Sequence, residues 1–550
     1  MSAPAAKPLI LAAVLALATS ATAGAQTLTP VQIKRIDSVF AQFDGTNRPG
    51  CALGVGQAGL PVYLRGYGMS DLQHMVPITP QSIFHVASVS KQFTAFAVGL
   101  LAQDGKVSLD DEVRKYIPEL PDYGKKITLR HLIYHTSGIR DQWELLGMAG
   151  WRYPDDLFTQ EDVLDIVVRQ KALNFSPGDE YVYSNSGYSL LAMIVQRVSG
   201  KTLREFADQR IFQPLGMTST HVHDDHSMIV PGRTSAFVMG PSRWKISIPD
   251  FDTHGATSLF TTVGDLLKWQ HNFDAMTVGS PSLIKDALTS AILTNGKPAN
   301  YGFGISIEKY RGAEAYGHGG ADAGYRADVV RFPAQHLDIA VACNFGEATP
   351  NVYSKAVADI VLEGKLEPRP AETKRATVAV SPARLEQLAG VYKASNSDQV
   401  FVLSVKDGKL VLDNFGMALE PVDQNHFTVF GTPVEFVGPA AAVPTAITVA
   451  ATGDSMLRMP AFRPATAQLA QFAGGYWSDE LRVSYRVDLK DSVLVLHPFK
   501  RPAQPLRAAF PDAFVGTEAG TVRFVRTKGV VTGFRLTGGR VRNVEFVKSR

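Results

Sequence analysis

The chain has 550 residues, of which 45% are hydrophobic and 19% are charged. One hydrophobic core rarely serves more than about 250–300 residues, so this length predicts several domains in a globular chain. Lys plus Arg number 55 and Asp plus Glu number 52, a balance that gives no support to a nucleic-acid partner. Two cysteines are too few for a disulfide framework or a Cys-rich zinc site.

Residues 1–25 have the pattern of a cleavable export signal. Lys7 supplies a positive charge, Leu9–Ala18 is a short apolar stretch, and Ala23-Gly-Ala25 is a small-residue cleavage site. A bilayer span needs about 20 apolar residues, and neither this stretch nor any later one reaches that length. We therefore expect a periplasmic or secreted protein without stable membrane insertion.

The texture of the remaining chain predicts three folded parts. Helical and strand patterns alternate over residues 26–366, as in a domain that mixes α and β structure. A polar segment with two prolines, residues 367–379, is typical of a linker. Beyond it, short alternating apolar stretches separated by Gly, Asp and Asn indicate all-β structure.

The β region contains an internal repeat. Residues 385–392 (LEQLAGVY) match residues 469–476 (LAQFAGGY), 84 positions later, and a second block further along repeats at the same offset. We predict two modules of similar fold, at 380–458 and 463–550. Each is long enough for a small antiparallel barrel of about eight short strands.

Two other patterns in the chain resemble ligand-binding motifs, one for a dinucleotide and one for a metal, but each is better explained by a turn or a loop. Residues 54–59 match the dinucleotide pattern G-x-G-x-x-G, but a second strand-like stretch follows where that fold requires a helix, so we predict a hairpin turn. Residues 221–226 (HVHDDH) place two imidazoles on one face of an extended chain, as in a metal site. No further ligand pattern supports a metal, and we predict a polar surface loop.

A serine and a lysine three residues apart carry the strongest catalytic pattern. The spacing of Val89, Phe93 and Phe96 predicts a buried helix that begins at Ser88, with Lys91 one turn later on the same face. A serine is a weak nucleophile until a base takes its proton, and a lysine kept neutral by burial can be that base. The helix N-terminus also offers backbone N–H groups to a developing oxyanion.

Two further elements make this pattern specific. Tyr183-Ser-Asn185 lies in a turn before an apolar helix over Tyr188–Val198. His318-Gly-Gly320 precedes two strand-like stretches, and its glycines would let a substrate backbone approach a sheet edge closely. Each element alone is typical of an ordinary turn, but their order and separation together indicate a catalytic site.

In these motifs the chain resembles the penicillin-recognising serine hydrolases, which include class C-type β-lactamases, D-Ala-D-Ala carboxypeptidases, esterases and D-stereospecific aminopeptidases. The resemblance covers about residues 30–365. It implies an α+β β-lactamase-like catalytic domain, with an antiparallel sheet flanked by helices, followed by two small antiparallel β-barrel domains. His318 stands where the β-lactamases carry lysine, as in the D-aminopeptidases and several esterases, which lowers the expectation of antibiotic hydrolysis.

The resemblance also implies catalytic roles. Ser88 would attack the carbonyl carbon and form an acyl-enzyme, Lys91 would accept its proton, and Tyr183 would pass a proton to the leaving group and later activate water. No metal or organic cofactor is implied.

Substrate binding would fall to the second and third motifs. Asn185 would hydrogen-bond Lys91 and the substrate amide, and His318, beside Gly320, would orient the substrate. The backbone N–H groups of Ser88 and Ala321 would form the oxyanion hole. Because an imidazole changes protonation between pH 5 and 8, we expect His318 to shape the pH dependence of the rate.

The function implied is that of an exported serine peptidase or amidase acting on small peptides that contain D-amino acids. An esterase, a weak β-lactamase or a carboxypeptidase would share the same fold. A β-lactam or muropeptide sensor that acylates without turnover is an alternative of another class. The oligomeric state stays open.

The resemblance raises two further questions. In the D-aminopeptidases a loop from the last barrel narrows the catalytic cleft. The second module here has a three-residue insertion within segment 497–505, and this segment contains Lys500 and Arg501. We predict that this segment or residues 514–521 enter the cleft, with a surface hairpin an equal alternative. Cys51 and Cys343 fall in strands that are neighbours in the family's sheet, so a disulfide is conceivable after export, but we slightly favour two buried thiols.

Overall fold

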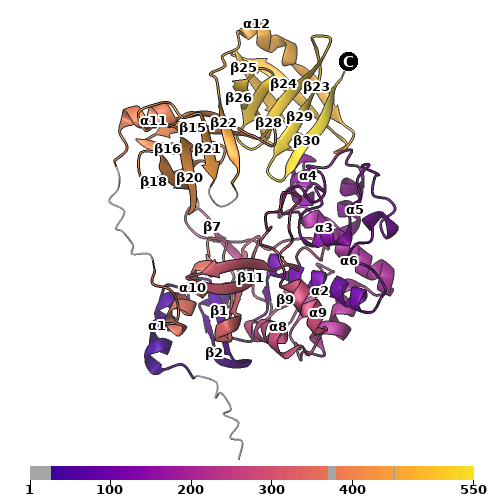
Figure 1. Ribbon diagram of the computed structural model, residues 1–550, viewed down its shortest axis with the longest axis vertical. Coiled ribbons are helices and arrows are strands. Elements are labelled where there is room, and N and C mark those ends of the chain that lie inside the picture. The colour runs from indigo at the N-terminus through magenta and orange to yellow at the C-terminus, as the bar shows by residue number, and fades with distance from the viewer. Residues whose placement is uncertain (1–26, 370–378, 430, 450–452, 550) are drawn as a thin grey trace, which may run out of the picture.

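The computed structural model describes residues 27–369, 379–429, 431–449 and 453–549 (Figure 1). The export signal expected at 1–25, and residues 370–378 of the expected linker, lie outside these ranges. Within them, no helix is both long and apolar enough to cross a membrane. Figure 1 shows the N-terminal α/β part below and two β bodies above it.

The N-terminal part is built on a six-stranded antiparallel sheet. β1 (Cys51–Gln57), from the start of the chain, lies between β2 (Leu60–Tyr67) and β13 (Leu337–Cys343), from the end of this part. The other half of the sheet consists of β12 (Tyr325–Phe332), β11 (Ala313–Asp322) and, at the edge, β10 (Ser306–Tyr310). β1 and β13 are buried almost throughout, because helices cover both faces of the sheet.

Residues 54–59 form the hairpin that the sequence predicts. β1 ends at Gln57 and β2 begins at Leu60, with Ala58 and Gly59 in the turn. Gly59 has a φ of +81°, and a Cβ there would lie 2.3 Å from the His271 ring, so only glycine fits. The glycines of this stretch serve the turn.

Helices on either face of the sheet enclose two hydrophobic cores. On one face, α1 (Pro30–Phe40) and α10 (Pro350–Val361) pack against β-strand residues such as Leu53 and Val341. The other face packs against α8 (Val263–Ala275) and the helical half of the domain. That half contains α2 (Ser90–Gln103), α3 (Leu129–Ile133), α4 (Gln142–Met148), α5 (Gln160–Val168), α6 (Asn185–Ser199), α7 (Leu203–Ala207) and α9 (Pro281–Ala287).

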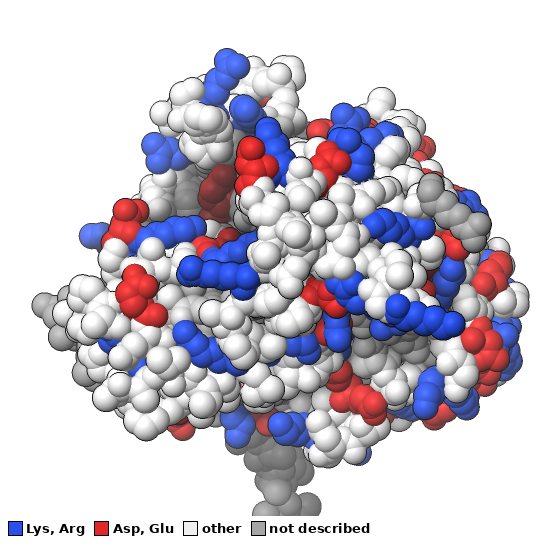
Figure 2. All heavy atoms as spheres, turned by 90° about the horizontal axis from the view of Figure 1, so that it is seen from above, with Lys and Arg blue, Asp and Glu red and all other residues white. Residues whose placement is uncertain are grey.

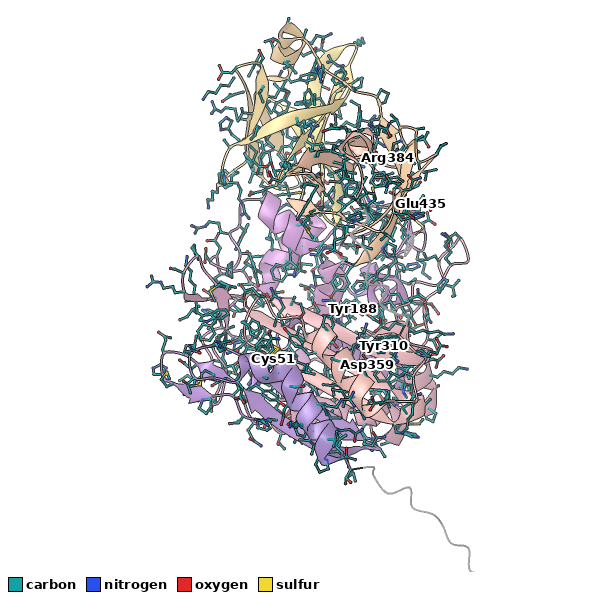
Figure 3. The ribbon with its side chains drawn as sticks, turned by 90° about the vertical axis from the view of Figure 1, so that its left-hand side faces the viewer. Cys51, Tyr188, Tyr310, Asp359, Arg384 and Glu435 are labelled. Carbon is teal, nitrogen blue, oxygen red and sulfur yellow. A yellow bond between two sulfur atoms is a disulfide. The ribbon has the colours of Figure 1, made fainter. Side chains whose placement is uncertain are left out.

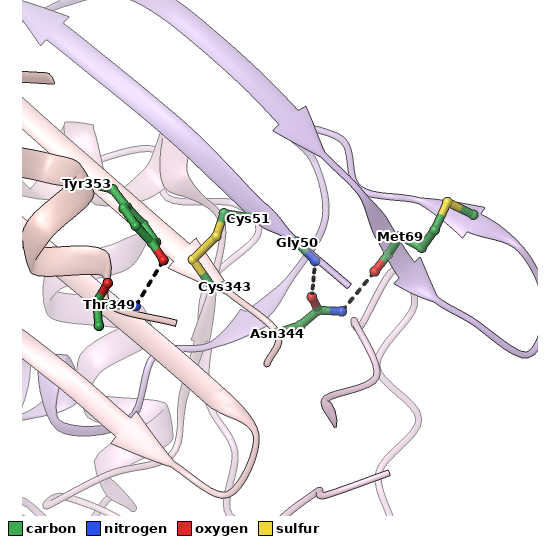
Figure 4. The surroundings of a disulfide bond; sticks show 7 residues. All are labelled: Gly50, Cys51, Met69, Cys343, Asn344, Thr349 and Tyr353. Atoms are coloured by element: carbon green, nitrogen blue, oxygen red, sulfur yellow. Dashed lines mark hydrogen bonds between the residues drawn. A yellow bond between two sulfur atoms is a disulfide. The ribbon is translucent and has the colours of Figure 1, made fainter. Parts of the chain in front are cut away.

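Cys51 and Cys343 form a disulfide bond, so our preference for two buried thiols is wrong (Figure 4). The two residues face each other in the register of β1 and β13, with a Cα–Cα distance of 4.0 Å. Beside them, the Asn344 side chain accepts a hydrogen bond from Gly50 N–H (2.8 Å) and donates one to the carbonyl of Met69 (3.0 Å). The disulfide joins the first strand of the sheet to the end of the domain.

The last module is a closed barrel of eight antiparallel strands, as predicted. We call it the second barrel. Its strands are β23 (Gly474–Ser478), β24 (Val483–Lys490), β25 (Val493–His497), β26 (Gln504–Phe510), β27 (Ala513–Gly516), β28 (Gly520–Thr527), β29 (Val530–Gly538) and β30 (Val541–Lys548). Alternate residues along these strands fill its core.

The module before it, the first barrel, has nine strands instead of about eight and is not fully closed. The extra strand arises because residues 417–421 form two short strands, which are the two ends of the sheet. The strands are β14 (Gly390–Ala394), β15 (Val400–Lys406), β16 (Lys409–Leu412), β17 (Met417–Ala418), β18 (Glu420–Pro421), β19 (His426–Val429), β20 (Thr432–Val437), β21 (Ala446–Val449) and β22 (Ser455–Met459).

Equivalent contacts in the two barrels follow the repeat in the sequence. The Tyr392 hydroxyl donates to the carbonyl of Leu388 (2.7 Å), and the Tyr476 hydroxyl donates to the carbonyl of Phe472 (2.6 Å). Both pairs are related by the offset of 84 residues. In each barrel a short helix, α11 (Pro382–Leu388) or α12 (Thr466–Leu469), leads into the first strand.

The second barrel sits directly on α4 of the N-terminal part (Figure 1). A buried ion pair joins the two parts, Arg140 Nη1 to Glu480 Oε1 at 2.6 Å, and both side chains are 1% exposed. Figure 3 separates the levels clearly: Arg384 and Glu435 lie in the first barrel, while Tyr188, Tyr310 and Cys51 lie below. From above, basic and acidic side chains are interspersed over the barrels (Figure 2).

Candidate active site

Ser88 lies in a tight turn that leads into α2. The sequence predicts that the helix begins at Ser88, but α2 begins at Ser90 and Ser88 sits in the preceding 3-10 turn, Ala87–Val89. Ala87 has a φ of +47°, an unusual conformation for a residue with a side chain. This turn leaves Ser88 part-exposed at the junction of two cavities, while Lys91 is fully buried behind it.

Lys91 has the surroundings of a neutral amine. Its Nζ lies 3.2 Å from Ser88 Oγ and donates to Asn185 Oδ1 (2.8 Å) and to the carbonyl of Ala256 (2.6 Å). Burial, helped by the charge of Arg540, lowers the pKa of Lys91 well below its usual value, although Asp141 opposes this. A neutral amine has two N–H groups and one lone pair. In the neutral form that the lowered pKa favours, Asn185 and Ala256 accept from the two N–H groups, which leaves the lone pair for Ser88.

Asn185 is the first residue of α6, and Tyr183 lies in the loop just before it. Burial raises the pKa of Tyr183, so its phenol stays protonated, while a hydrogen bond with Ser88 acts against this rise. The Tyr183 ring centroid is 4.7 Å from Lys91 Nζ. The predicted S-x-x-K and Y-x-N motifs therefore meet around one hydroxyl group.

His318 and Gly320 lie on β11, along an edge that is open for a substrate. β10 pairs with β11 only as far as Ser306 opposite Gly317, so beyond Gly317 that edge has no strand partner among the described residues. A Cβ on Gly320 would lie 2.2 Å from the carbonyl oxygen of Val86, so glycine lets β11 approach the Ser88 turn. Ser88 and Ala321 line both adjoining cavities together.

The expectation that His318 titrates between pH 5 and 8 is wrong. Burial and the neighbouring Lys91 lower the pKa of His318 to about 4. Its Nε2 lies 2.9 Å from the Tyr301 hydroxyl, and its Nδ1 lies 2.5 Å from the carbonyl of Gly319. The imidazole is therefore neutral in that range and acts as a fixed hydrogen-bonding group.

Ser90 and the histidines of residues 221–226 lie outside the site. Ser90 is buried, with its hydroxyl donating to the carbonyl of Ala87 (2.5 Å) and accepting from Leu259 N–H (2.8 Å). His221 begins a short strand, β6 (His221–Val222), that pairs with β9 (Leu259–Thr261), and His223 packs its ring 4.3 Å from that of Phe260. The prediction of a polar surface loop is therefore wrong for His223, which is only 5% exposed.

Sequence analysis missed three residues that hold the site in place. Asp141, fully buried, accepts hydrogen bonds from the backbone (2.7 Å) and side-chain (2.9 Å) nitrogens of Asn185. Arg540, from the turn between β29 and β30 of the second barrel, lies 3.1 Å from the other oxygen of Asp141. Arg540, Asp141 and Asn185 thus connect the barrel to Lys91.

The third residue is His135, which fixes the loop around Tyr183. Its carbonyl accepts from Val182 N–H (3.0 Å) and its Nδ1 accepts from Ser184 N–H (3.1 Å), one residue to either side of Tyr183. Its ring centroid is 4.3 Å from that of Tyr183. His135 lies outside the three motifs, and nothing near Arg540 pointed to the site.

Ser88 lies where two cavities of about 560 Å³ each meet. The sheet-side cavity runs along β11 past His318 and Gly320. The barrel-side cavity has aromatic walls and a rim from the second barrel; its lining includes Ser88, Trp143, Trp151, Tyr153, Phe158, Tyr183, Arg326, Arg501 and Arg540. Arg501 belongs to segment 497–505, which confirms that this segment reaches the cleft; residues 514–521 do not line this cavity.

Comparison with known proteins agrees with this geometry. The family model named Beta-lactamase matches residues 36–362, more than half of the sequence, and the chain belongs to this family. The resemblance implied by the three motifs is therefore confirmed.

Individual relatives are distant. A D-aminopeptidase from Gluconobacter oxydans is 26% identical over 323 residues, which are 59% of this chain and 60% of that protein. Penicillin-binding protein 4* from Bacillus subtilis is 25% identical over 72% of this chain and 89% of its own length. The octameric penicillin-binding protein homologue from Pyrococcus abyssi has a similar fold, with a TM-score of 0.55 and 21% identity over 86% of this chain and 97% of its own.

Proposed function

We propose that this protein is a serine hydrolase that cleaves amide bonds of small peptides through an acyl-enzyme on Ser88. The observation that carries the proposal is the environment of Lys91. Both N–H groups of its neutral amine have acceptors, so its lone pair is directed to the Ser88 hydroxyl at 3.2 Å. Such a lysine can take the proton of Ser88 as the hydroxyl oxygen attacks.

The residues around Ser88 provide a proton acceptor, a proton donor and an oxyanion hole for the proposed reaction. Ser88 Oγ bonds to the carbonyl carbon as its proton moves to Lys91, and the backbone N–H groups of Ser88 and Ala321 receive the negative charge on the carbonyl oxygen. The C–N bond then breaks as the protonated Tyr183 donates to the leaving amine. Lys91 returns its proton to Tyr183. The oxygen of a water molecule then bonds to the acyl carbon while its proton passes through Tyr183 to Lys91, and the carbon–Oγ bond breaks as Ser88 Oγ takes that proton, which releases the acid.

The proposed substrates are short peptides that contain D-residues. The D-aminopeptidase relative supports this class, although its similarity to this chain covers only three fifths of its length. The open edge of β11 offers backbone hydrogen bonds to an extended substrate, and the second barrel closes the cavity on one side. Because the barrel leaves limited room, short substrates fit best. We further propose that the protein acts after export.

A hydrolysis panel with matched variants tests this function. The panel comprises D-Ala and L-Ala p-nitroanilides, short acyl esters, nitrocefin and D-Ala-D-Ala peptides. Ser88→Ala should abolish turnover, and mass spectrometry after a fluorophosphonate should find the adduct on Ser88. Ser90→Ala is the control, since Ser90 is buried away from both cavities.

Two results would refute the proposal. An adduct on Ser90 would show that Ser90, and not Ser88, is the nucleophile. An adduct on Ser88 that persists, with no substrate of the panel turned over, would favour a sensor that acylates without releasing its ligand.

A further inference from the structure

The barrel-side cavity is lined by two arginines, Arg501 and Arg326, that take part in no ion pair among the described residues. Arg501 donates to the carbonyl of Trp151 (2.5 Å), and Arg326 donates to the carbonyls of Ala323 (2.9 Å) and Tyr325 (2.7 Å). Neither arginine forms an ion pair with any carboxylate in the part of the chain that the structure describes. A carbonyl contact satisfies one N–H group but leaves the positive charge uncompensated.

The acidic residues of this cavity are already engaged. Asp322 lies 2.9 Å from His85 Nε2, accepts from the Thr257 hydroxyl at 2.9 Å, and is also bonded by Tyr153. Burial raises the pKa of Glu144, whose carboxyl lies 3.7 Å from Arg540 Nε. Asp322 and Glu347 act electrostatically on Arg326 without forming an ion pair with it. Arg501 is therefore the guanidinium of this cavity that lacks a carboxylate partner among the described residues.

The aromatic side chains beside these arginines strengthen the effect. Trp143, Trp151 and Phe158 form an edge-to-face cluster, with ring centroids 4.8 Å apart for Trp143 and Phe158 and 5.7 Å apart for Trp151 and Phe158. An apolar wall lowers the local dielectric, so an anion beside it interacts more strongly with a guanidinium than it would in water.

We propose that the barrel-side cavity binds a carboxylate of the substrate, with Arg501 as its principal donor and Arg326 as a second positive charge. The inference rests on the proposed function and specifies its substrate class: short peptides or acyl amino acids with a free carboxylate on the part that enters this cavity. A guanidinium matches a carboxylate with two parallel N–H donors. Because Arg501 belongs to the second barrel, the barrel would set substrate specificity.

Matched pairs of substrates test the inference. N-acetyl-D-Ala-D-Ala is compared with its C-terminal amide, and succinyl-D-Ala p-nitroanilide with acetyl-D-Ala p-nitroanilide, so that each end of the scissile bond is probed with and without a carboxylate. We expect the acid to be preferred about tenfold or more in kcat/KM in one pair, since a hydrogen bond to a charged group contributes this much.

Two variants separate a carboxylate site from a general effect of the loop. Arg501→Gln should remove most of the preference, so that the acid and its neutral partner are turned over at similar kcat/KM. Lys500→Gln, at the neighbouring exposed residue that does not line the cavity, should keep the preference. A preference that Arg501→Gln leaves intact, or no preference in either pair, would overturn the inference while the proposed hydrolase function stands.

A binding measurement keeps the test independent of turnover. N-acetyl-D-Ala-D-Ala should protect Ser88 from a fluorophosphonate at lower concentration than its amide does, and Arg501→Gln should abolish this difference. Equal protection by acid and amide would contradict a carboxylate site. If no substrate is hydrolysed but the difference in protection persists, then the proposed function fails and the anion site stands.

Discussion

The two C-terminal barrels have a common sequence repeat and similar folds but make very different contacts with the catalytic part. Asn396 in the first barrel and Glu480 in the second occupy equivalent positions, 84 residues apart. Asn396, an exposed residue, donates to the carboxylate of Glu180 (2.9 Å), whereas Glu480 is buried against Arg140 (2.6 Å). At this position the first barrel therefore makes a surface hydrogen bond, and the second barrel makes a buried ion pair.

The same contrast extends to the loops. The second barrel sends Arg501 and Arg540 into the cavity beside Ser88, and its Tyr485 hydroxyl donates to the carbonyl of Met148 (2.7 Å). The first barrel packs on the second instead, through Asp398 and Arg523 (2.6 Å). The strands determine the barrel, and a few loop residues determine which barrel takes part in the site.

The largest effect should come from the buried ion pair. Glu480→Gln leaves the Arg140 guanidinium buried without its counter-charge, which costs about 3–5 kcal/mol. We expect the second barrel to separate from the catalytic part at lower temperature or denaturant concentration, as measured by calorimetry and limited proteolysis.

Asn396→Ala is the matched control for Glu480→Gln. It removes an exposed hydrogen bond at the equivalent position and should change stability by less than about 0.5 kcal/mol. Equal shifts for the two variants would show that the barrels do not differ in docking strength.

The disulfide should have the next largest effect, and only on the catalytic part. It joins residues 292 positions apart, and removing such a link typically costs about 2–4 kcal/mol. Cys51→Ala combined with Cys343→Ala should lower the unfolding temperature of the catalytic part, while unfolding of the barrels is unchanged. Full-length protein whose unfolding does not respond to reductant, with both thiols titratable, would contradict this expectation.

The sequence predicts local patterns well and contacts between distant segments poorly. Ser88, Lys91, Tyr183 and Asn185 carry recognisable motifs, and the repeat predicts both barrels. The Cys51–Cys343 bond depends on the register of two strands from opposite ends of the domain, which no local pattern encodes. Arg540 reaches Asp141 from 399 positions away by sequence numbering.

Burial explains the remaining errors about the site. The sequence predicts that His318 titrates near neutral pH because an isolated imidazole does so. Its enclosure beside Lys91 is a property of the folded site, and this enclosure lowers its pKa to about 4. His223 likewise follows a polar pattern in sequence but packs against Phe260.

The contribution of the second barrel to the base should be visible in the pH profile. Arg540 lowers the pKa of Lys91, so Arg540→Gln should raise that pKa. Because the neutral amine is the active form, a higher pKa moves the ascending limb of the pH–rate profile to higher pH, by up to about one pH unit. Asp141→Asn removes an opposing charge and should shift the limb to lower pH.

Arg542→Gln is the control for this pH shift. Arg542 lies on the same hairpin but pairs with Glu180 (2.9 Å). Its removal should leave the limb in place. An identical profile for wild type and Arg540→Gln would show that the barrel does not tune Lys91.

The smallest effect should distinguish the barrels at the tyrosine that they share. Tyr476→Phe removes one hydrogen bond, to the carbonyl of Phe472, and should cost about 1 kcal/mol. Tyr392→Phe removes the equivalent bond to Leu388 and also the acceptor of Arg458 Nη1 (2.7 Å), so it should cost more. Urea denaturation of each variant measures this difference. In an Arg458→Met background the two tyrosine substitutions should have equal cost; if the difference survives there, it arises from the open edge of the first barrel and not from Arg458.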